Sequence, residues 1–78
     1  MKNQHLSLFG TDHCHLCKQA EQMLKNLNIN SVTLVEITED LQLLALYELL
    51  IPVLQRDDTK AELNWPFDKN DVISFVQD

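Results

Sequence analysis

The chain has 78 residues, which leaves room for a single domain (1–78) and no second core. Its hydrophobic fraction of 45% is enough for one folded core and argues against disorder. The net charge is −6, from 12 acidic and 6 basic residues, and no two basic residues adjoin. This pattern excludes a phosphate-tracking, nucleic-acid-binding surface and attraction to an anionic membrane.

The first nine residues carry one lysine and an apolar run that polar residues interrupt. A signal peptide needs about 7–15 apolar residues and a membrane span about 20, so we expect neither. The protein is therefore expected to be cytoplasmic, where thiols are kept reduced. In that compartment a cysteine pair is more often catalytic or metal-binding than structural.

The first third of the chain predicts a strand, a loop and a helix. Residues 5–9 read as a short strand, and Gly10, the only glycine, is expected where the backbone tolerates no Cβ. From His15 to Leu27, apolar residues recur at helical spacing. Asn28 and Asn30 then supply residues that accept the left-handed conformation in which helices commonly end.

The middle of the chain predicts a strand and a leucine-rich helix. Val32 to Ile37 is apolar on both faces and rich in β-branched residues, as expected of a buried central strand. Thr38 is expected to cap a helix from Leu41 to about Leu49, and Pro52 to stop it. This helix is apolar nearly all round, so it either packs deep in the core, which we favour, or meets a partner or a second copy.

The last third predicts a hairpin and a helix. Residues 52–55 and 60–63 are expected to be strands around the turn 56–59, with Pro66 ending the hairpin. Asp68 is expected to cap a final helix. The order is then β-α-β-α-β-β-α, an α/β arrangement. Its opening βαβ unit has parallel strands and a right-handed crossover, whereas its closing strands are antiparallel.

The main chemical signal is Cys14-His15-Leu16-Cys17, at the junction of the first strand and the first helix. Unpaired N–H groups and the helix dipole stabilise a thiolate at a helix N-terminus, so Cys14 is the expected nucleophile. The three-residue offset places Cys17 one turn further in, close enough to form a disulfide and less exposed. Cys17 is therefore the expected resolving thiol, which would release the product from a mixed disulfide.

Two histidines flank Cys14. When protonated, His15 or His13 would stabilise the thiolate by charge; the alternative is that both are exposed and have little effect. The segment 13–17 also holds four donors suited to zinc or copper(I), so a metal-binding or metal-transfer module is the main alternative function. Adjacent residues project in different directions from a helix start, and we therefore expect no metal site. A third hypothesis is a redox-inactive interaction domain.

The chain resembles the glutaredoxin and thioredoxin superfamily, and in particular the short bacterial glutaredoxin-like proteins. The resemblance rests on segments that follow one another in the family's order and together span about Leu6 to Val76. These segments are Leu8–Thr11, Cys14–Cys17, Val35–Thr38, Tyr47–Leu54 and Leu63–Phe67.

The resemblance implies a thioredoxin/glutaredoxin-like fold, with a four-stranded mixed sheet and three helices. It implies thiol–disulfide exchange through Cys14 and Cys17 on protein or small-molecule disulfides. It further implies that the Ile51–Pro52 peptide bond is cis and faces the cysteines. The Ile51 backbone would there pair with an extended substrate peptide or with glutathione. Only about 5–6% of X–Pro bonds in folded proteins are cis, so composition alone would not suggest this feature.

Two departures from the family bear on the electron donor. The Gly-Gly pair of glutathione-using members is replaced by Asn64-Trp65-Pro66-Phe67-Asp68, and the basic residue before the first cysteine by Asp12 and His13. Thioredoxin's Trp-Cys-Gly-Pro-Cys motif is absent as well. We expect no bound cofactor and a monomeric protein. The reductant stays open between glutathione, as a co-substrate, and a thioredoxin-type reductase.

Overall fold

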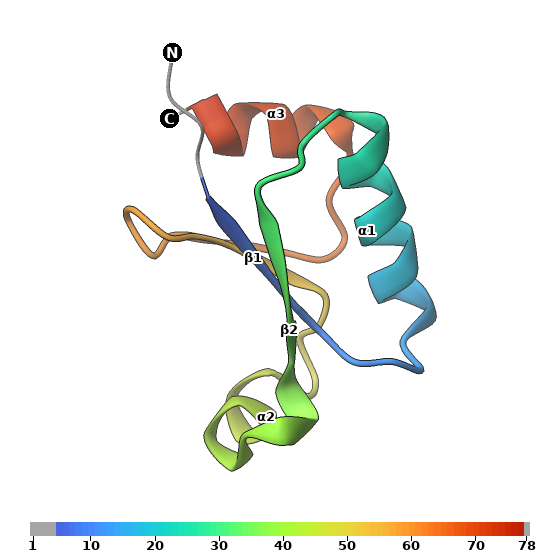
Figure 1. Cartoon of the computed structure of the whole chain (residues 1–78), viewed down its shortest axis with the longest axis vertical. Coiled ribbons are helices and arrows are strands. Elements are labelled where there is room, and N and C mark those ends of the chain that lie inside the picture. Colours follow the sequence, from blue (N-terminus) through green and yellow to red (C-terminus); the bar gives the residue numbers. More distant parts are fainter. Residues whose placement is uncertain (1–4, 78) are drawn as a thin grey trace.

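The computed structural model describes residues 5–77. Within them a four-stranded sheet in the order β2-β1-β3-β4 is accompanied by three α-helices (Figure 1). The elements in chain order are β1 (Leu6–Gly10), α1 (His15–Asn26), β2 (Val32–Glu36), the 3-10 helix η1 (Ile37–Glu39), α2 (Leu41–Tyr47), β3 (Val53–Arg56), β4 (Glu62–Asn64) and α3 (Lys69–Gln77). The predicted order β-α-β-α-β-β-α and the mixed sheet are confirmed.

Strand β1 lies inside the sheet between two differently oriented neighbours. It pairs in parallel with β2, with Gly10 opposite Glu36, and antiparallel with β3, with Phe9 opposite Val53. β3 pairs antiparallel with β4. The carboxyl ends of β1 and β2 and the amino end of β3 therefore meet at one end of the sheet. The cysteine motif follows β1 at this end, and Pro52 precedes β3.

Strand β2 is an edge strand, so the prediction of a buried central strand at 32–37 is wrong. Leu34 is 57% exposed, and the strand ends at Glu36, after which Ile37 begins η1. A run of apolar β-branched residues indicates burial on two faces but does not encode a place in the sheet. Topology sets that place, because the crossover puts β2 on one side of β1 and β3 occupies the other.

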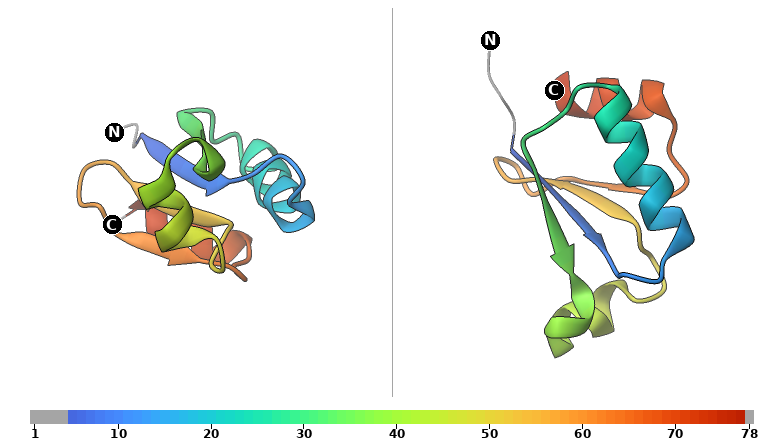
Figure 2. Two further views of the ribbon diagram at one scale, coloured as in Figure 1. Left: turned by 90° about the horizontal axis from the view of Figure 1, so that it is seen from below. Right: turned by 45° about the vertical axis from the view of Figure 1, so that its right-hand side comes forward.

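Two separate apolar clusters cover the sheet. One lies between the sheet and the helices α1 and α3, and its buried members are Leu6, Leu8, Ala20, Leu24, Leu54, Phe67 and Val72. The other lies between the sheet and α2, and its buried members are Phe9, Ile37 and Val53. Successive side chains of a strand point to opposite faces, which is why neighbours in β1 and β3 belong to different clusters. α2 stands at the opposite end of the molecule from α3 (Figure 2).

Helix α2 has no buried residue, so the expected deep packing of this leucine-rich helix is wrong. Leu43, Leu44 and Tyr47 pack against the smaller cluster and are only half-buried. Leu41 is 81% exposed and Leu46 is 64% exposed. The helix sits at the end of the sheet and offers one side to it, and no other described element covers its remaining leucines.

Tyr47, at the end of α2, contacts residues of the sheet. Its ring stacks on Phe9 with centroids 4.5 Å apart, and its hydroxyl donates a hydrogen bond to Glu62. The Glu62 carboxylate raises the pKa of Tyr47 to about 12, so the phenol keeps its proton, and this hydrogen bond, at neutral pH. The helix ends at Tyr47, two residues before the predicted Leu49.

The helix caps agree with the prediction at α3 and differ from it at α2. Asp68 accepts a hydrogen bond at 2.8 Å from the first turn of α3, as predicted. Thr38 does not cap α2, because it lies inside η1 and its hydroxyl donates to Glu36. Asp40 is the cap instead: its backbone is extended (φ −143°, ψ 117°), and its carboxylate accepts two N–H groups of α2 at 2.8 and 3.3 Å.

The remaining boundaries move by one or two residues, the usual uncertainty at the ends of elements. α1 ends at Asn26. Asn28 takes the left-handed conformation (φ 61°) as predicted, whereas Asn30 does not. The turn between β3 and β4 contains a second left-handed residue, Lys60 (φ 64°). No helix in the described part of the chain is long and apolar enough to cross a membrane.

Candidate redox site

Cys14 and Cys17 form a disulfide, with Cα atoms 5.1 Å apart. Cys14 is the N-cap of α1, where its backbone is extended (φ −95°, ψ 106°) and its Sγ accepts a hydrogen bond from the Cys17 N–H at 3.0 Å. Cys17 is 7% exposed, whereas Cys14 is only half-buried. The structure thus contains one sulfur at the helix terminus, within reach of solvent, and one sulfur beneath it.

Gly10 makes room for the inner sulfur. A Cβ atom at this position would lie 2.8 Å from the Cys17 Sγ and 3.2 Å from the Cys17 Cβ. The φ angle of Gly10 is not positive, so the position requires space rather than unusual backbone freedom. The prediction that this site tolerates no Cβ is confirmed, and the reason is that Cys17 packs directly on the end of β1.

The Ile51–Pro52 peptide bond is cis, the isomer that the resemblance implies. The register of β1 and β3 places Pro52 beside Gly10 at the same end of the sheet, and the proline ring is buried. The Ile51 N–H donates a hydrogen bond to the Tyr47 carbonyl at 3.1 Å, while the Ile51 carbonyl accepts none within residues 5–77. An extended peptide docking here would therefore meet a free acceptor, and it would meet a free donor only after the bond to Tyr47 opened.

His13 and His15 are both exposed. Neither ring forms a hydrogen bond to a cysteine sulfur in the described part of the chain. Within residues 5–77, no group of three or more His, Cys, Asp or Glu side chains is arranged to hold a metal ion. The four donors of the segment 13–17 are thus close in sequence without converging on one point.

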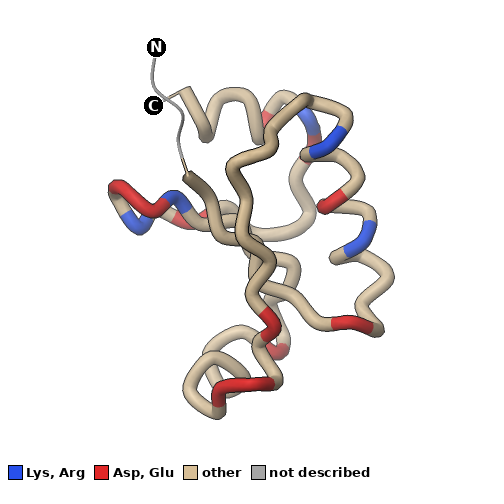
Figure 3. Tube along the Cα trace, viewed as in Figure 1, with Lys and Arg blue, Asp and Glu red and all other residues tan. Residues whose placement is uncertain are grey.

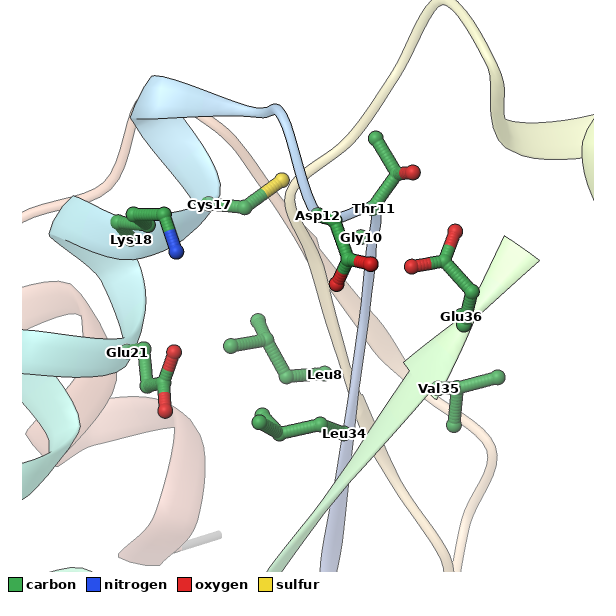
Figure 4. A pocket seen from close by; sticks show the side chains of 10 residues that line it. All are labelled: Leu8, Gly10, Thr11, Asp12, Cys17, Lys18, Glu21, Leu34, Val35 and Glu36. Atoms are coloured by element: carbon green, nitrogen blue, oxygen red, sulfur yellow. The ribbon is translucent and has the colours of Figure 1, made fainter. Parts of the chain in front are cut away.

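A cavity of about 150 Å³ opens beside the inner sulfur, between α1 and the strands β1 and β2 (Figure 4). Its lining residues are Leu8, Gly10, Thr11, Asp12, Cys17, Lys18, Glu21, Leu34, Val35 and Glu36. Sites for drug-sized ligands usually measure about 300–1,000 Å³, so this one suits a side chain or a few waters. The cysteine motif did not point to this cavity. The signal that could have found it is the parallel pairing of the first two strands, which brings Glu36 opposite Gly10.

Negative charge surrounds this cavity. Hydrogen bonds from the side chains of Thr11 and Thr38 hold the pKa of Glu36 below its usual value, so this carboxylate is ionised at neutral pH. The Asp12 and Glu36 side chains lie on the same side of the cavity in Figure 4. Lys18 is the one cation among the lining residues.

The model of the family described as Glutaredoxin-like domain (DUF836) matches residues 5–77. The crystal structure of the protein XcR50 from X. campestris has a TM-score of 0.84 at 36% identity, covering 92% of this chain and 95% of that one. The solution structure of XcR50 gives a TM-score of 0.83 at 34% identity, with 94% and 92% covered.

Protein Ne2328 from Nitrosomonas europaea shares the fold, with a TM-score of 0.81 at 23% identity over 96% of this chain and 93% of that one. No curated protein matches the chain. The family match covers nearly the whole chain, and the paired cysteines lie at the strand–helix junction that the fold provides. The chain belongs to the glutaredoxin-like family of thioredoxin-fold proteins.

Proposed function

We propose that the protein is a thiol–disulfide oxidoreductase in which Cys14 is the nucleophile and Cys17 the resolving thiol. The observation that carries the proposal is the unequal placement of the two sulfurs, one capping a helix and one 7% exposed beneath it. After reduction, the N–H group that contacts the Cys14 Sγ would donate to a thiolate. A charge-assisted hydrogen bond and the positive end of the helix dipole both favour that charge.

The reduced protein would act in two steps. The Cys14 thiolate attacks one sulfur of a substrate disulfide, the substrate S–S bond breaks, and its other sulfur leaves as a thiolate. The Cys17 thiolate then attacks the Cys14 Sγ, which closes the Cys14–Cys17 disulfide and releases the second substrate thiolate. Two electrons pass from the protein to the substrate, and a reductant must return them.

Three further assignments belong to the proposal. Ile51 and Pro52 position the substrate, with the Ile51 carbonyl as the available acceptor. His15, and to a smaller extent His13, stabilises the Cys14 thiolate when protonated, an effect that salt would weaken because both side chains are exposed. Glutathione or a thioredoxin-type reductase in the cytoplasm supplies the electrons.

Two matched variants test the division of labour between the sulfurs. With a synthetic peptide disulfide as substrate, Cys17→Ser should accumulate a mixed disulfide with Cys14, detected by mass spectrometry under non-reducing conditions. Cys14→Ser, which retains the buried thiol, should form little or none. Multiple turnover by Cys17→Ser at the rate of the unmodified protein would show that the two-thiol mechanism is wrong.

A redox titration tests the pair itself. The metal-free protein is equilibrated in graded glutathione buffers, and its free thiols are alkylated and counted by mass. We expect one two-electron transition between about −180 and −280 mV, the range of catalytic dithiols. Failure of the Cys14–Cys17 disulfide to form in that range, together with tight zinc or copper(I) uptake, would instead favour the metal-binding alternative.

A further inference from the structure

Exposed leucines lie within or next to the two chain segments that form the proposed redox site. Leu16, which lies between the two cysteines, is 41% exposed. Leu49 and Leu50, which immediately precede Ile51, are 93% and 47% exposed, and Leu46 on α2 is 64% exposed. We name these four leucines the apolar rim. They come from the two segments that form the site, the start of α1 and the stretch from α2 to Pro52.

The charged side chains at the same end of the molecule are mostly acidic, and Lys18, which lines the cavity beside Cys17, is the exception. Asp12 follows β1, Glu36, Glu39 and Asp40 lie at and after the end of β2, and Glu48 follows α2. In Figure 3, the lower part of the view, with α2 and the loop before α1, shows Asp and Glu alone. The described Lys and Arg residues lie on α1, on α3, at the end of β3 (Arg56) and in the turn that follows it (Lys60).

We propose that this end of the molecule docks a disulfide-bearing protein whose contact surface is apolar and bordered by Lys and Arg side chains. The inference rests on the proposed function and specifies its substrate class. An apolar contact would cover the rim, because exposed apolar side chains gathered at one place commonly mark interaction sites. Basic side chains at its border would meet the carboxylates of this end, and complementary charge steers association.

The same charges disfavour two other occupants. A second copy docked through this face would set its carboxylates against the identical set of its partner, and like charges brought together oppose association. Glutathione disulfide carries four carboxylates and offers no apolar surface to the leucines. The exchange step is unchanged: the Cys14 thiolate attacks the partner's disulfide, Cys17 resolves the mixed disulfide, and the partner leaves as a dithiol.

The test compares three synthetic peptides that contain the same internal disulfide and the same leucines. They differ only in flanking residues, which are lysines, glutamines or glutamates. The reduced protein is mixed with each peptide, and the second-order exchange rate is followed by quenched thiol labelling. We expect the lysine peptide to react about tenfold or more faster than the glutamate peptide at low salt, with the glutamine peptide between them. In 0.5 M NaCl this spread should largely disappear, because salt screens exposed charges.

Matched variants separate the contributions of charge and apolar contact. Glu48→Gln should lower the preference for the lysine peptide, whereas Asp57→Asn, which removes one charge at the turn between β3 and β4, should not. Leu49→Ser should slow all three peptides. Ile73→Ser, at a 39% exposed position on α3, should leave them unchanged.

Equal rates for the three peptides with no salt dependence, or a loss of rate that is the same at Ile73 as at Leu49, would overturn the docking inference while leaving disulfide exchange intact. Absence of exchange with every peptide would overturn the proposed function itself.

Discussion

Helix α1 buries Cys17, Ala20 and Leu24, whereas α2, with four leucines in seven residues, buries none completely. α1 lies against the sheet face that α3 also covers, so one side of the helix is enclosed along its length. α2 stands at the end of the sheet and covers only the small cluster around Phe9 and Val53. Leucine content therefore does not set burial; the position of a helix relative to the sheet does. One helix holds the fold together, while the other leaves apolar side chains free for contact.

The largest expected difference in the free energy of unfolding is between two variants that each shorten one leucine, Leu24 in α1 or Leu46 in α2, to alanine. Leu24→Ala, at a position 3% exposed, should lower the free energy of unfolding by about 2–5 kcal/mol, because it leaves a cavity in the larger cluster. Leu46→Ala, at a position 64% exposed, should change it by no more than about 0.5 kcal/mol. Urea denaturation of both disulfide-bonded variants measures the difference. Equal losses would mean that α2 is enclosed in solution.

The close contact between α1 and β1 can be tested with Gly10→Ala. The new methyl group would press on the Cys17 Sγ, and overpacking of this kind costs about 1–3 kcal/mol. The cost should fall in a Cys17→Ala background, because the nearest atom is then gone. All four proteins of this double-mutant cycle are compared under reducing conditions. An unchanged cost in that background would show that something other than the sulfur confines the position.

The cap of α2 should matter to a helix with so little buried surface. Asp40→Ala removes the acceptor of two N–H groups and should lower the free energy of unfolding by about 1 kcal/mol. Asp40→Asn keeps a capping oxygen and should retain most of that stability. Thermal unfolding followed by circular dichroism compares the variants. If the asparagine variant were as unstable as the alanine variant, the side-chain cap would not be the cause.

Helix α3 is anchored to the sheet by a buried cation in addition to its apolar contacts. Arg56 is 3% exposed, donates to the Phe75 carbonyl at 2.7 Å, and forms a two-pronged contact with Asp58 at 2.7 and 3.0 Å. The Arg56 guanidinium lowers the pKa of Asp58 to about 2 from an ordinary value of 3.8. Because the folded-state pKa lies below the unfolded one, the stabilisation is present above about pH 4 and is lost as the pH falls toward 2.

The smallest change in the free energy of unfolding is expected from Asp58→Asn, and this change should depend on pH. The gap in unfolding free energy between the unmodified protein and this variant should stay constant above about pH 5 and narrow as the pH falls toward 2. Urea denaturation at several pH values measures it. A gap independent of pH over that range would contradict the assigned role of the ionised carboxylate.

The sequence predicted what local pattern determines. Alternating strand and helix periods specified the element order. The cysteine motif at the first strand–helix junction specified which sulfur lies at the helix terminus, and the solitary glycine specified a position without room for a Cβ. The resemblance supplied the cis bond before Pro52, which no local pattern encodes.

The errors and omissions have long-range causes. The place of β2 at the edge and the exposure of α2 depend on how elements assemble, which hydrophobicity alone does not reveal. Thr38 satisfies the usual preference for a cap, and Asp40 displaced it because residues 37–39 form a 3-10 turn. The sequence pattern assigned Arg56 to a turn, but the residue is buried. Its burial could not be predicted locally, because the Phe75 carbonyl to which it donates a hydrogen bond lies 19 residues away.

The hydrogen bond from the Cys17 N–H to the Cys14 Sγ has a consequence for folding as well as for chemistry. A thiolate accepts such a bond more strongly than a disulfide sulfur does, so reduction strengthens the first turn of α1 where oxidation supplies a covalent link. Folding and redox state then form a thermodynamic cycle. Any stabilisation that the folded chain gives to the thiolate must reappear, with the same magnitude, as a greater tendency of the Cys14–Cys17 disulfide to accept electrons. Substitutions in the first turn of α1 would therefore change two measurements, the unfolding curve and the equilibrium between the dithiol and disulfide forms of Cys14 and Cys17.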